Sequence, residues 1–342
     1  MNTLVRTTAE QVKEYCGRIG ADPLLVQGAG GNVSWKDGDT LWIKASGTWL
    51  AESMTKEIFV PVDLAHLRQA IPKKDFSATP KIVGDSNLRP SIETFLHALM
   101  PQRVVVHLHA IEVLAHLVHE NFQADFQSLL DDSTSCAVVD YYKPGASLSA
   151  AINAVLIQKP TTKVFFLKNH GVVIAGADVE EVNQIMSELT LALFTRPADI
   201  CPPSHLLSVK PEKLIDQYAP VADININQLA LNPDLFKRLS SDWALYPDHV
   251  VFLGPKAYTF ESWEALNNAG KLGQNLPELV FIFGEGVFVR STFNKAKQVQ
   301  LRCYFDVIAR QKPHSPLKAL TDSQIAELLD WDAEQYRMNL AQ

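Results

Sequence analysis

Two histidines share one face of a predicted strand. Residues 104–109 read VVVHLH, a run of β-branched residues that ends in His-x-His, and such a run favours a β-strand. Residues two apart on a strand point to the same face, about 6–7 Å apart at Cα, which allows His107 and His109 to share one metal ion. A pair of hydrogen-bonded core or edge histidines is the alternative interpretation.

A third histidine follows another predicted strand. Residues 162–167 form an apolar run, and His170 lies in the turn before a second apolar run at 172–176. A ligand so far along the chain from the His-x-His pair is typical of a metal site assembled by tertiary folding. Three histidines with one open position describe a catalytic metal site and not a closed structural one.

A glycine-rich stretch at residues 28–31 precedes a predicted hairpin. Glycines let backbone N–H groups turn toward a ligand, which permits an anion site, and Ser46 and Gly47 after the returning strand can serve the same anion. The stretch is not a dinucleotide fingerprint, because Val33 stands where the last glycine belongs and no helix follows. A tight turn between a helix and a hairpin is the alternative.

Glu93 lies in the first turn of a predicted helix that runs to about Met100, with Ser91 as its N-cap. Glu93 and His97 have helical i, i+4 spacing and so share one helix face. A first-turn carboxylate is also favoured by the helix dipole alone, which is the structural alternative for Glu93. For His97 we prefer a packing role. His116 and His119 are read as partly exposed helix residues and not as ligands.

Composition bounds the class of protein. The 342 residues are 47% hydrophobic, enough for a substantial core in one large or two smaller domains. The net charge is -7 and no basic cluster occurs, so nucleic acid is an unlikely partner. A small anionic substrate is still compatible with this charge, because local groups form such sites.

The lack of a recognisable targeting signal, together with the cysteine usage, predicts a cytoplasmic protein. The N-terminus has no apolar signal segment, and no run of 18 apolar residues predicts a transmembrane helix or a membrane partner. The four cysteines are far apart and form no C-x-x-C pair. Buried free thiols in a reducing compartment are therefore expected.

A break at residues 201–204 predicts two parts, residues 1–200 and 205–342. In the second part we expect helices near 210–218, 233–240, 260–270, 293–311 and 321–338, and strands at 250–253, 279–283 and 286–290. Residues 164–173 can be aligned with 280–288, which suggests a degenerate partial repeat of a strand-turn-strand-helix unit. Glu285 then takes the position of His170, so the copy lacks this ligand.

Four ordered motifs together resemble the class II aldolase/adducin family, which includes fuculose- and rhamnulose-phosphate aldolases, ribulose-phosphate 4-epimerases and adducin head domains. The resemblance covers about residues 7–200. Its motifs are GGNVS at 30–34, ASG at 45–47, PSIE at 90–93, and HLH at 107–109 with NHG at 169–171. The tail around residues 246–250 looks like the segment that follows the aldolase-like domain in fused rhamnulose-phosphate aldolase/dehydrogenase proteins, although no dehydrogenase fingerprint follows here.

The resemblance implies a three-layer α/β/α domain with a mostly antiparallel central sheet, followed by a smaller α/β C-terminal region. It implies a divalent metal, usually zinc or else Mn²⁺ or Co²⁺, held by His107, His109 and His170. Glu93 would be the acid/base residue and a resting-state ligand. The implied phosphate cradle consists of Gly31, Asn32, Ser46, Gly47 and Ser91. Many relatives are homotetramers, so a homo-oligomer is expected.

The resulting hypothesis is a metal-dependent carbon–carbon lyase that acts on a sugar, sugar phosphate or sugar acid through a metal-stabilised enediolate. Ile92 departs from the family pattern, which often has a second hydroxyl residue before the catalytic Glu, and isoleucine cannot donate a hydrogen bond to phosphate. Epimerisation, decarboxylation or dehydration at the same site is the first alternative. A non-catalytic adducin-like assembly module is the second.

Overall fold

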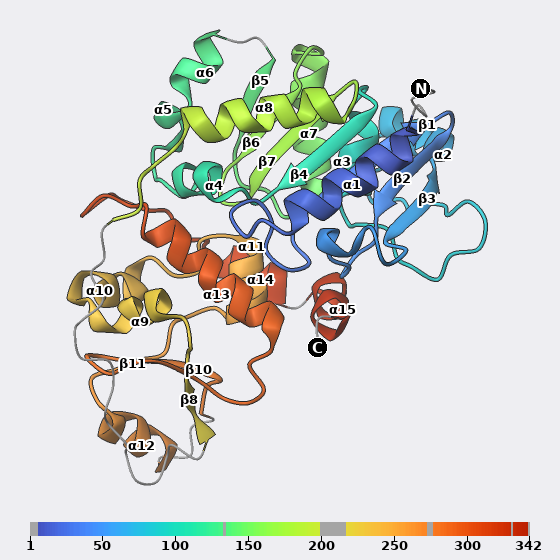
Figure 1. Cartoon of the computed structure of the whole chain (residues 1–342). Coiled ribbons are helices and arrows are strands. Elements are labelled where there is room, and N and C mark those ends of the chain that lie inside the picture. The colour runs from blue at the N-terminus through green and yellow to red at the C-terminus, as the bar shows by residue number, and fades with distance from the viewer. Residues whose placement is uncertain (1–5, 133–134, 199–216, 272–275, 330, 341–342) are drawn as a thin grey trace, which may run out of the picture.

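The computed structural model describes residues 6–132, 135–198, 217–271, 276–329 and 331–340. A larger sheet with its helices forms the N-terminal part, and a smaller sheet with further helices forms the C-terminal part (Figure 1). The predicted break at 201–204 and the helix predicted near 210–218 lie, except for the last residues of that helix, outside the described residues. Cys16, Cys136 and Cys303 are buried free thiols, as predicted.

The N-terminal part is built on a seven-stranded sheet with the order β3-β2-β1-β4-β7-β6-β5. Its strands are β1 (Asn32–Asp37), β2 (Thr40–Lys44), β3 (Phe59–Asp63), β4 (Val104–Leu108), β5 (Cys136–Val139), β6 (Val164–Leu167) and β7 (Gly171–Gly176). Every neighbouring pair is antiparallel except β5 and β6. The predicted histidine strand β4 is therefore central, between β1 and β7.

Helices cover both faces of this sheet (Figure 1). One layer contains α1 (Thr8–Gly20), α4 (Ile111–Leu117) and α8 (Val179–Ala192), and the other contains α2 (Leu64–Ala70), α3 (Thr94–Leu99) and α7 (Ala146–Gln158). The β-branched run of β4 serves both, because Val104 and Val106 join the first apolar cluster and Val105 joins one on the opposite face. The three-layer, mostly antiparallel fold is thus confirmed.

Two short helices, α5 (Phe122–Asp125) and α6 (Gln127–Asp132), extend the first layer. The 3-10 turns η1 (Leu50–Glu52) and η2 (Ile71–Lys73) follow β2 and α2. The opening helix α1 has Thr7 as its N-cap, in a capping box with Glu10.

The C-terminal part has a four-stranded sheet with the order β8-β11-β10-β9. Its strands are β8 (Ala219–Pro220), β9 (Thr259–Phe260), β10 (Leu279–Ile282) and β11 (Gly286–Val289). Its helices are α9 (Ile224–Leu231), α10 (Pro233–Ser241), α11 (Pro247–Leu253), α12 (Trp263–Lys271), α13 (Lys295–Ile308), α14 (Asp322–Leu329) and α15 (Asp332–Leu340). Ile111, Leu114 and Val118 from the α4 segment belong to the same buried cluster as this region, so the two parts share a core.

Several predicted elements are wrong in detail. Residues 250–253, predicted as a strand, lie in helix α11, which begins at Pro247 and is buried on all sides. A short apolar run without period does not separate a buried strand from a buried helix. The helix predicted at 321–338 is two helices, α14 and α15. His119 lies beyond the end of α4, in an isolated bridge to Leu317.

The two segments of the suggested repeat have the same order of secondary-structure elements. The units β6-β7-α8 and β10-β11-α13 each consist of an antiparallel strand pair followed by a helix of 14 residues. Glu285 lies in the turn of the second unit and is half-buried. A common origin for the two units stays a hypothesis.

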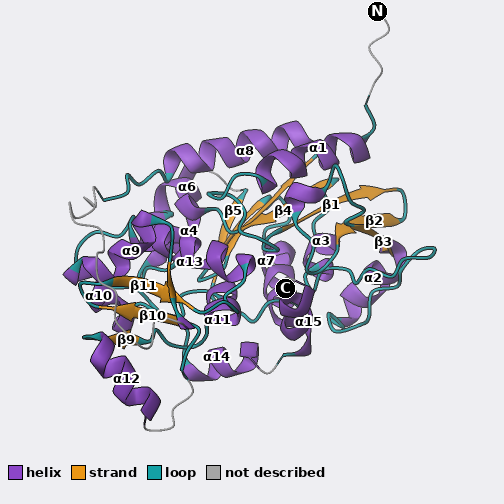
Figure 2. Cartoon of the chain, turned by 60° about the horizontal axis from the view of Figure 1, so that its bottom comes forward, coloured by secondary structure: helices purple, strands orange, loops and turns teal. Residues whose placement is uncertain are grey.

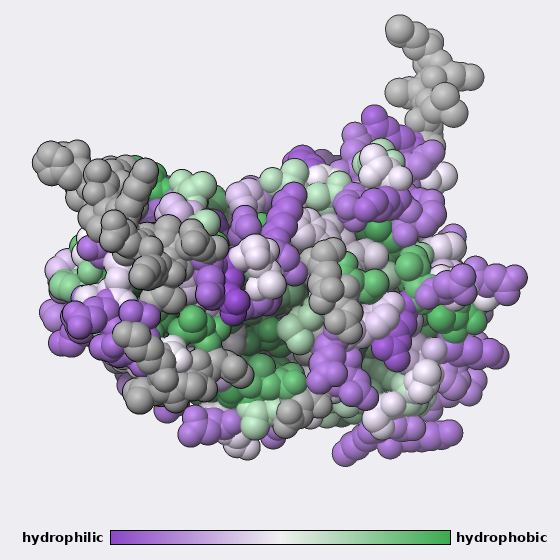
Figure 3. All heavy atoms as spheres, turned by 90° about the horizontal axis from the view of Figure 1, so that it is seen from below, coloured by the Kyte–Doolittle hydropathy of each residue, from purple (hydrophilic) through white to green (hydrophobic). Residues whose placement is uncertain are grey.

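The face seen from below carries hydrophobic side chains toward its middle and hydrophilic ones toward its edges (Figure 3). Among the described residues, no helix is both long enough and apolar enough to cross a bilayer.

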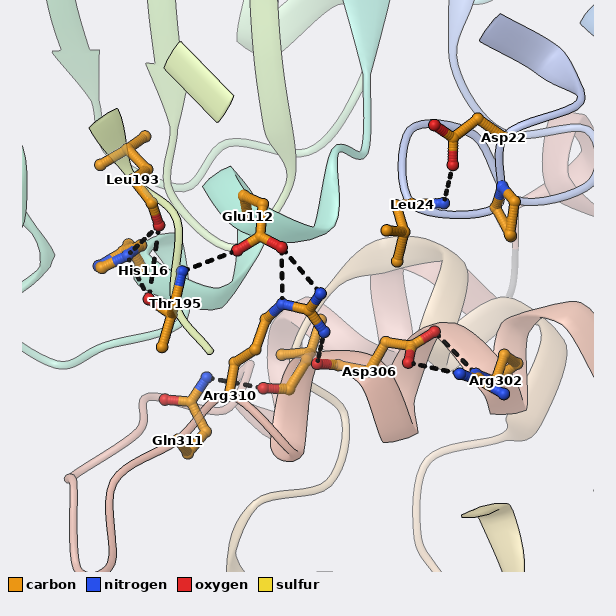
Figure 4. Close-up of polar contacts among 12 residues, drawn as sticks. Asp22, Leu24, Glu112, His116, Leu193, Thr195, Arg302, Asp306, Arg310 and Gln311 are labelled. Carbon is orange, nitrogen blue, oxygen red and sulfur yellow. Dashed lines mark hydrogen bonds and ion pairs between the residues drawn. The ribbon is translucent and has the colours of Figure 1, made fainter. Parts of the chain in front are cut away.

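A buried ion pair joins the two parts of the chain (Figure 4). Glu112 of α4 accepts hydrogen bonds from Arg310 Nε at 2.9 Å and from Nη2 at 2.7 Å, and the side chains are 5% (Arg310) and 6% (Glu112) exposed. Glu112 also accepts a bond from the backbone N–H of Thr195. One carboxylate thus holds α4, the segment after α8 and the segment after α13 together.

We expect Glu112→Gln to lower the free energy of unfolding by about 3–5 kcal/mol, because it leaves the Arg310 guanidinium buried without a counter-charge. Urea denaturation followed by circular dichroism measures this change. Glu52→Gln is the matched control, since its pair with Lys56 is more exposed and should change stability by under about 1 kcal/mol. Equal effects of the two substitutions would contradict the role given to Glu112.

A buried neutral histidine makes stability pH-dependent. His249 packs against the rings of Trp243, Tyr246 and Tyr304, and burial lowers its pKa to about 3. Because its pKa in the folded state lies below the unfolded value, the unfolded chain binds the extra proton. Stability is therefore lost as the pH falls below about 6.5.

Between pH 7.5 and 5.5 the wild type should lose about 1.4 kcal/mol more stability than His249→Gln. The comparison uses the change within each protein, so the cost of the substitution itself cancels. Urea titrations at the two pH values measure it. The same pH-dependent loss in both proteins would show that His249 is not a source of acid sensitivity.

Candidate metal and substrate site

The central strands bring the glycine-rich turn beside the histidine strand. Asn32 at the start of β1 pairs in register with His107 at the end of β4. Gly31 has φ +64°, and a Cβ there would stand 2.8 Å from the carbonyl oxygen of His107. Only glycine combines this left-handed backbone with so close an approach to the neighbouring strand. The turn thus fixes the position of Asn32 relative to His107.

Three imidazoles converge at the ends of β4 and β6. His107 Nε2 lies 3.2 Å from His109 Nε2, and ring centroids place His170 4.7 Å from His107 and 5.4 Å from His109. One ligand atom from each residue lies within 4.8 Å of the others, and all three residues are buried. His107 Nδ1 is 3.2 Å from the Val172 carbonyl oxygen, which orients Nε2 toward the other rings when Nδ1 carries the proton.

Glu93 joins the three histidines. Its Oε2 lies 3.5 Å from His107 Nε2, and its Oε1 lies 3.7 Å from His170 Nε2. Asn32 Nδ2 donates a hydrogen bond of 2.8 Å to Oε2. The helix begins later than predicted: Glu93 is the N-cap of α3, and the Ser91 hydroxyl accepts a bond from the Glu93 backbone N–H. Glu93 is therefore held just before the helix and not in its first turn.

His97 is hydrogen-bonded to the residue that holds Glu93. It is fully buried, its Nε2 is hydrogen-bonded to Asn32 Oδ1, and its Nδ1 lies 2.7 Å from the hydroxyl of Ser34. Asn32 therefore connects His97 to Glu93. This buried position is consistent with the packing role predicted for His97. From there the His97 side chain orients Asn32 and, through Asn32, Glu93.

Burial keeps two of the three histidines neutral. Burial lowers the pKa of His109 and of His170 to about 3. Burial also raises the pKa of Glu93, but the nearby His107 and His170 and the Asn32 hydrogen bond more than offset this, so the pKa of Glu93 is lowered. Neutral imidazoles and an ionised carboxylate are the forms that bind a divalent cation.

The residues proposed for substrate binding line the same small cavity, of about 30 Å³. They are Gly31, Asn32, Ser46, Gly47 and Ser91, and Ile92 is also part of its wall. The amide of Asn32 is already engaged with Glu93 and His97. The structure thus brings all the predicted site residues together around one space.

Sequence reasoning missed three charged residues of this cavity: Lys44, Asp248 and Arg337. Asp248 Oδ2 lies 3.5 Å from His109 Nδ1, and its carboxylate is paired with Arg337, Nη1 to Oδ1 at 3.0 Å. Burial lowers the pKa of Lys44 to about 7. Asp248 lies in the 246–250 segment that resembled fused aldolase proteins, which was the one available signal. Nothing in the sequence pattern indicated Arg337.

Asp248 gives His109 the partner that a metal-ligating imidazole needs. A carboxylate at Nδ1 leaves Nε2, which faces His107, free to bind a metal. Burial raises the pKa of Asp248, but Arg337 and His109 lower it by more than burial raises it. The pKa of Asp248 is therefore below its usual value. The C-terminal part therefore supplies part of the site.

A second cluster contains His116, His119 and Asp125, which are partly buried. His119 is bonded at both nitrogens, to Asp125 Oδ2 at 2.5 Å and to Gln311 Oε1 at 2.8 Å. His116 Nε2 is bonded to the Leu193 carbonyl oxygen. These bonds connect α4 and the residues just after it to α5, to the end of α8 and to the segment after α13. That His116 and His119 are not metal ligands stays a prediction.

Comparisons with known proteins match the N-terminal part. A protein of Bacillus subtilis (strain 168), named Uncharacterized oxidoreductase YuxG, is 26% identical in an alignment of 182 residues that covers 48% of this chain. The matched region spans 26% of that protein, about a quarter of its length.

Solved structures with partial similarity include three proteins whose titles name an aldolase. The N-terminal class II aldolase domain of a conserved protein from Thermoplasma acidophilum is 23% identical, covers 56% of this chain and 95% of its own, and has a TM-score of 0.47. YgbL from Klebsiella pneumoniae, a putative aldolase/epimerase/decarboxylase by its title, has 23% identity, 55% and 89% coverage and a TM-score of 0.40. A sugar-phosphate aldolase from Thermotoga maritima has 16% identity, 54% and 91% coverage and a TM-score of 0.43.

The assignment of the chain rests on a family sequence model and not on these structural scores. The model described as "Class II Aldolase and Adducin N-terminal domain" matches residues 11–193, more than half of the chain. This range contains the glycine-rich turn, Glu93 and the three histidines. The chain therefore belongs to the class II aldolase and adducin N-terminal domain family.

Proposed function

We propose that the protein is a divalent-metal-dependent aldolase, a carbon–carbon lyase that acts on a sugar, sugar phosphate or sugar acid. One observation carries the proposal: three imidazoles and one carboxylate converge on a single buried point at the wall of a cavity. Family membership supports an enzyme with a sugar-like substrate. The reaction type is our inference from the site.

The donor set fits a divalent metal. His107, His109 and His170 would hold it through Nε2, and Glu93 would be an additional ligand in the resting state. Among the described residues, Glu93 Oε1 is buried without a hydrogen-bond partner, which is unusual for a carboxylate oxygen and suits a ligand atom. The nitrogen-rich set favours Zn²⁺, with Mn²⁺ and Co²⁺ as alternatives. When bound, such an ion supplies Lewis-acid stabilisation of negative charge on substrate oxygens.

Glu93 is the residue that moves the proton. Its carboxylate lies beside His107 and His170 and is held by one hydrogen bond from Asn32, whereas the Asp248 carboxylate is paired with Arg337. For cleavage, Glu93 would take the proton from the substrate hydroxyl as the carbon–carbon bond breaks, which leaves an aldehyde and an enediolate. The enediolate then takes up a proton on carbon, and the same carboxyl group can return it.

Two other functions are compatible with the family. One is a different reaction at the same residues, and the other is a non-catalytic role that needs none of them. Epimerisation, decarboxylation and dehydration of a sugar derivative all pass through related anions and need the same ligands. An adducin-like assembly module needs no convergent histidines, and the presence of three with Glu93 argues against this reading. We also propose a homo-oligomer, with a tetramer favoured, which sedimentation of the full chain measures.

Product analysis tests the proposal. Metal-loaded protein is incubated with a panel of sugars, sugar phosphates and sugar acids, and products are identified by mass spectrometry and an aldehyde trap. Aldehyde release supports the lyase. An isomer of unchanged mass indicates epimerisation, loss of carbon dioxide indicates decarboxylation, and loss of water indicates dehydration. Absence of bound metal after reconstitution would favour the assembly module.

A further inference from the structure

The C-terminal part contains a cavity of its own, separate from the histidines. It has about 290 Å³ of free volume, near the lower end of the range of about 300–1,000 Å³ for small-molecule pockets. Its walls come from the end of α11 and the residues after it, from β10, from the start of α13 and from α15. It shares no lining residue with the cavity of the histidines. A molecule bound here would therefore be distinct from a substrate bound at the metal site.

Aromatic rings form much of the wall of this cavity. They belong to Trp243, Phe252, Tyr258, Phe281 and Phe293. The indole N–H of Trp243 donates a hydrogen bond of 3.0 Å to the carbonyl oxygen of Gly254, so its one polar atom already has a partner. The rings of Trp243 and Phe281 meet edge to face, with centroids 5.7 Å apart. Such a wall favours a flat aromatic ligand, which packs against rings in stacked or edge-to-face contacts.

The charges at the cavity favour an anion. Its charged side chains are those of Lys256, Glu278 and Lys297. Glu278 and Lys297 form an ion pair with each other. Lys256 is exposed, and its ammonium lies 5.1 Å from the centroid of the Tyr258 ring. No carboxylate in the part of the chain that the structure describes lies within ion-pair distance of Lys256. One positive charge beside an aromatic wall suits a ligand that carries a single negative charge.

The same wall supports the carboxylate beside His109. Phe252 lies one turn after Asp248 in α11, and its ring centroid is 5.8 Å from the guanidinium of Arg337. Arg337 is paired with Asp248, and Asp248 Oδ2 lies 3.5 Å from His109 Nδ1. Met338, next to Arg337, lines the cavity. Helix α11 lies between the C-terminal sheet and α15 (Figure 2). A ligand that packs on Phe252 and Met338 therefore contacts both helices that form the Arg337–Asp248 pair.

We propose that this cavity binds a small aromatic carboxylate, with its ring against the aromatic wall and its carboxylate at Lys256, and that this ligand is an effector of the metal site. By packing on Phe252 and Met338 it favours the arrangement of α11 and α15 in which Asp248 contacts His109. A ligand shifts such an equilibrium only as far as it binds one arrangement more tightly than the other. The ligand site goes beyond the proposed function, and only its coupling refers to the metal.

Calorimetric titration of the full chain with naphthylacetate tests the site, with naphthylethanol as the neutral counterpart. Wild type should bind naphthylacetate saturably, with and without zinc, and more tightly than naphthylethanol. Lys256→Gln should weaken naphthylacetate binding about twofold to fivefold and leave naphthylethanol unchanged, because it removes one exposed charge. Lys237→Gln, the same change at an exposed position of α10, is the matched control and should bind as wild type does.

A second variant fills the cavity. Ala257 is half-buried and lines it, so the indole of Ala257→Trp should take up the space and abolish binding of both probes. Circular dichroism establishes that this variant folds, and the Lys256→Gln comparison decides the question if it does not. Absence of saturable binding to wild type, or binding that a folded Ala257→Trp retains, overturns the site. Binding confined to the zinc-loaded protein would place the acid on the metal and overturns it as well.

Zinc affinity, measured by competition with a chelator, tests the coupling. Saturating naphthylacetate should tighten zinc binding to wild type about fivefold or more, and zinc should tighten naphthylacetate binding by the same factor. Ala257→Trp should show neither change. Zinc affinity that is unchanged or weaker in the presence of the acid overturns the effector role. Absence of zinc from the wild type would refute the proposed function, whereas binding of the acid to the metal-free chain is measured independently of it.

Discussion

Glu93→Gln is expected to keep its metal and lose turnover by about 10²–10⁴-fold, the usual contribution of a positioned acid/base group. Glutamine has nearly the same shape as glutamate and can still accept the Asn32 hydrogen bond, but it cannot take up a proton at neutral pH. The three histidines are untouched by this change and should continue to bind the ion. The measurement is the rate of product formation by metal-loaded protein, with metal content determined on the same samples.

Asn32→Ala is the companion to this experiment. It removes the hydrogen bond that orients Glu93 but leaves the carboxylate in place, so its loss of rate should be smaller than that of Glu93→Gln. Turnover of Glu93→Gln near the wild-type rate would remove Glu93 from the mechanism. Loss of metal from Glu93→Gln would instead make Glu93 mainly a ligand.

His107→Ala is expected to bind little or no metal after reconstitution, while the wild type binds about one ion per chain. His107 is central to the cluster, since its Nε2 lies within 3.5 Å of both His109 Nε2 and Glu93 Oε2. Removing it leaves two imidazoles and a carboxylate, which hold a divalent ion less tightly. Elemental analysis of dialysed protein gives the metal-to-chain ratio.

His116→Ala is the matched control for this loss. His116 belongs to the partly buried cluster in which its Nε2 already bonds to a backbone carbonyl oxygen. This variant should retain the wild-type metal content. Equal metal loss from both variants would mean that the ion, if any, is not bound where we place it.

The central part of the site could be read from the sequence because its ligands sit on strong local patterns. A β-branched run such as residues 104–108 has one common conformation, and the side-chain alternation of a strand then fixes which residues share a face. His170 lies in the turn between two apolar strands, which confines it to one end of the sheet. The motif order added the family, and with it the layered fold.

The C-terminal contributions could not be read in the same way. Asp248 and Arg337 are 89 positions apart and meet only because α11 and α15 pack in one region. A single carboxylate or arginine has no local pattern that marks it as a partner of a distant histidine. Residues 250–253 also show that a short apolar run is equally compatible with a buried helix and a buried strand.

The start of α3 shows a smaller error of the same origin. Ser91 has the chemistry of an N-cap, but its hydroxyl accepts a bond from Glu93, and the helix begins after Glu93. Helix boundaries depend on which backbone groups the surrounding structure satisfies, and here Ser91 N donates to the carbonyl oxygen of Lys44 on β2. The tertiary contact with the sheet displaced the boundary that the sequence pattern favoured.

X-ray absorption spectroscopy at the metal edge of reconstituted wild-type protein tests the central claim most directly, because it identifies the ligands of the ion. For a zinc-loaded sample we expect about three imidazole nitrogens at about 2.0–2.1 Å together with one or two oxygen ligands, which correspond to His107, His109, His170 and Glu93 or a solvent oxygen. A spectrum dominated by oxygen ligands without imidazole scattering, or one with sulfur ligands, would contradict the site described here.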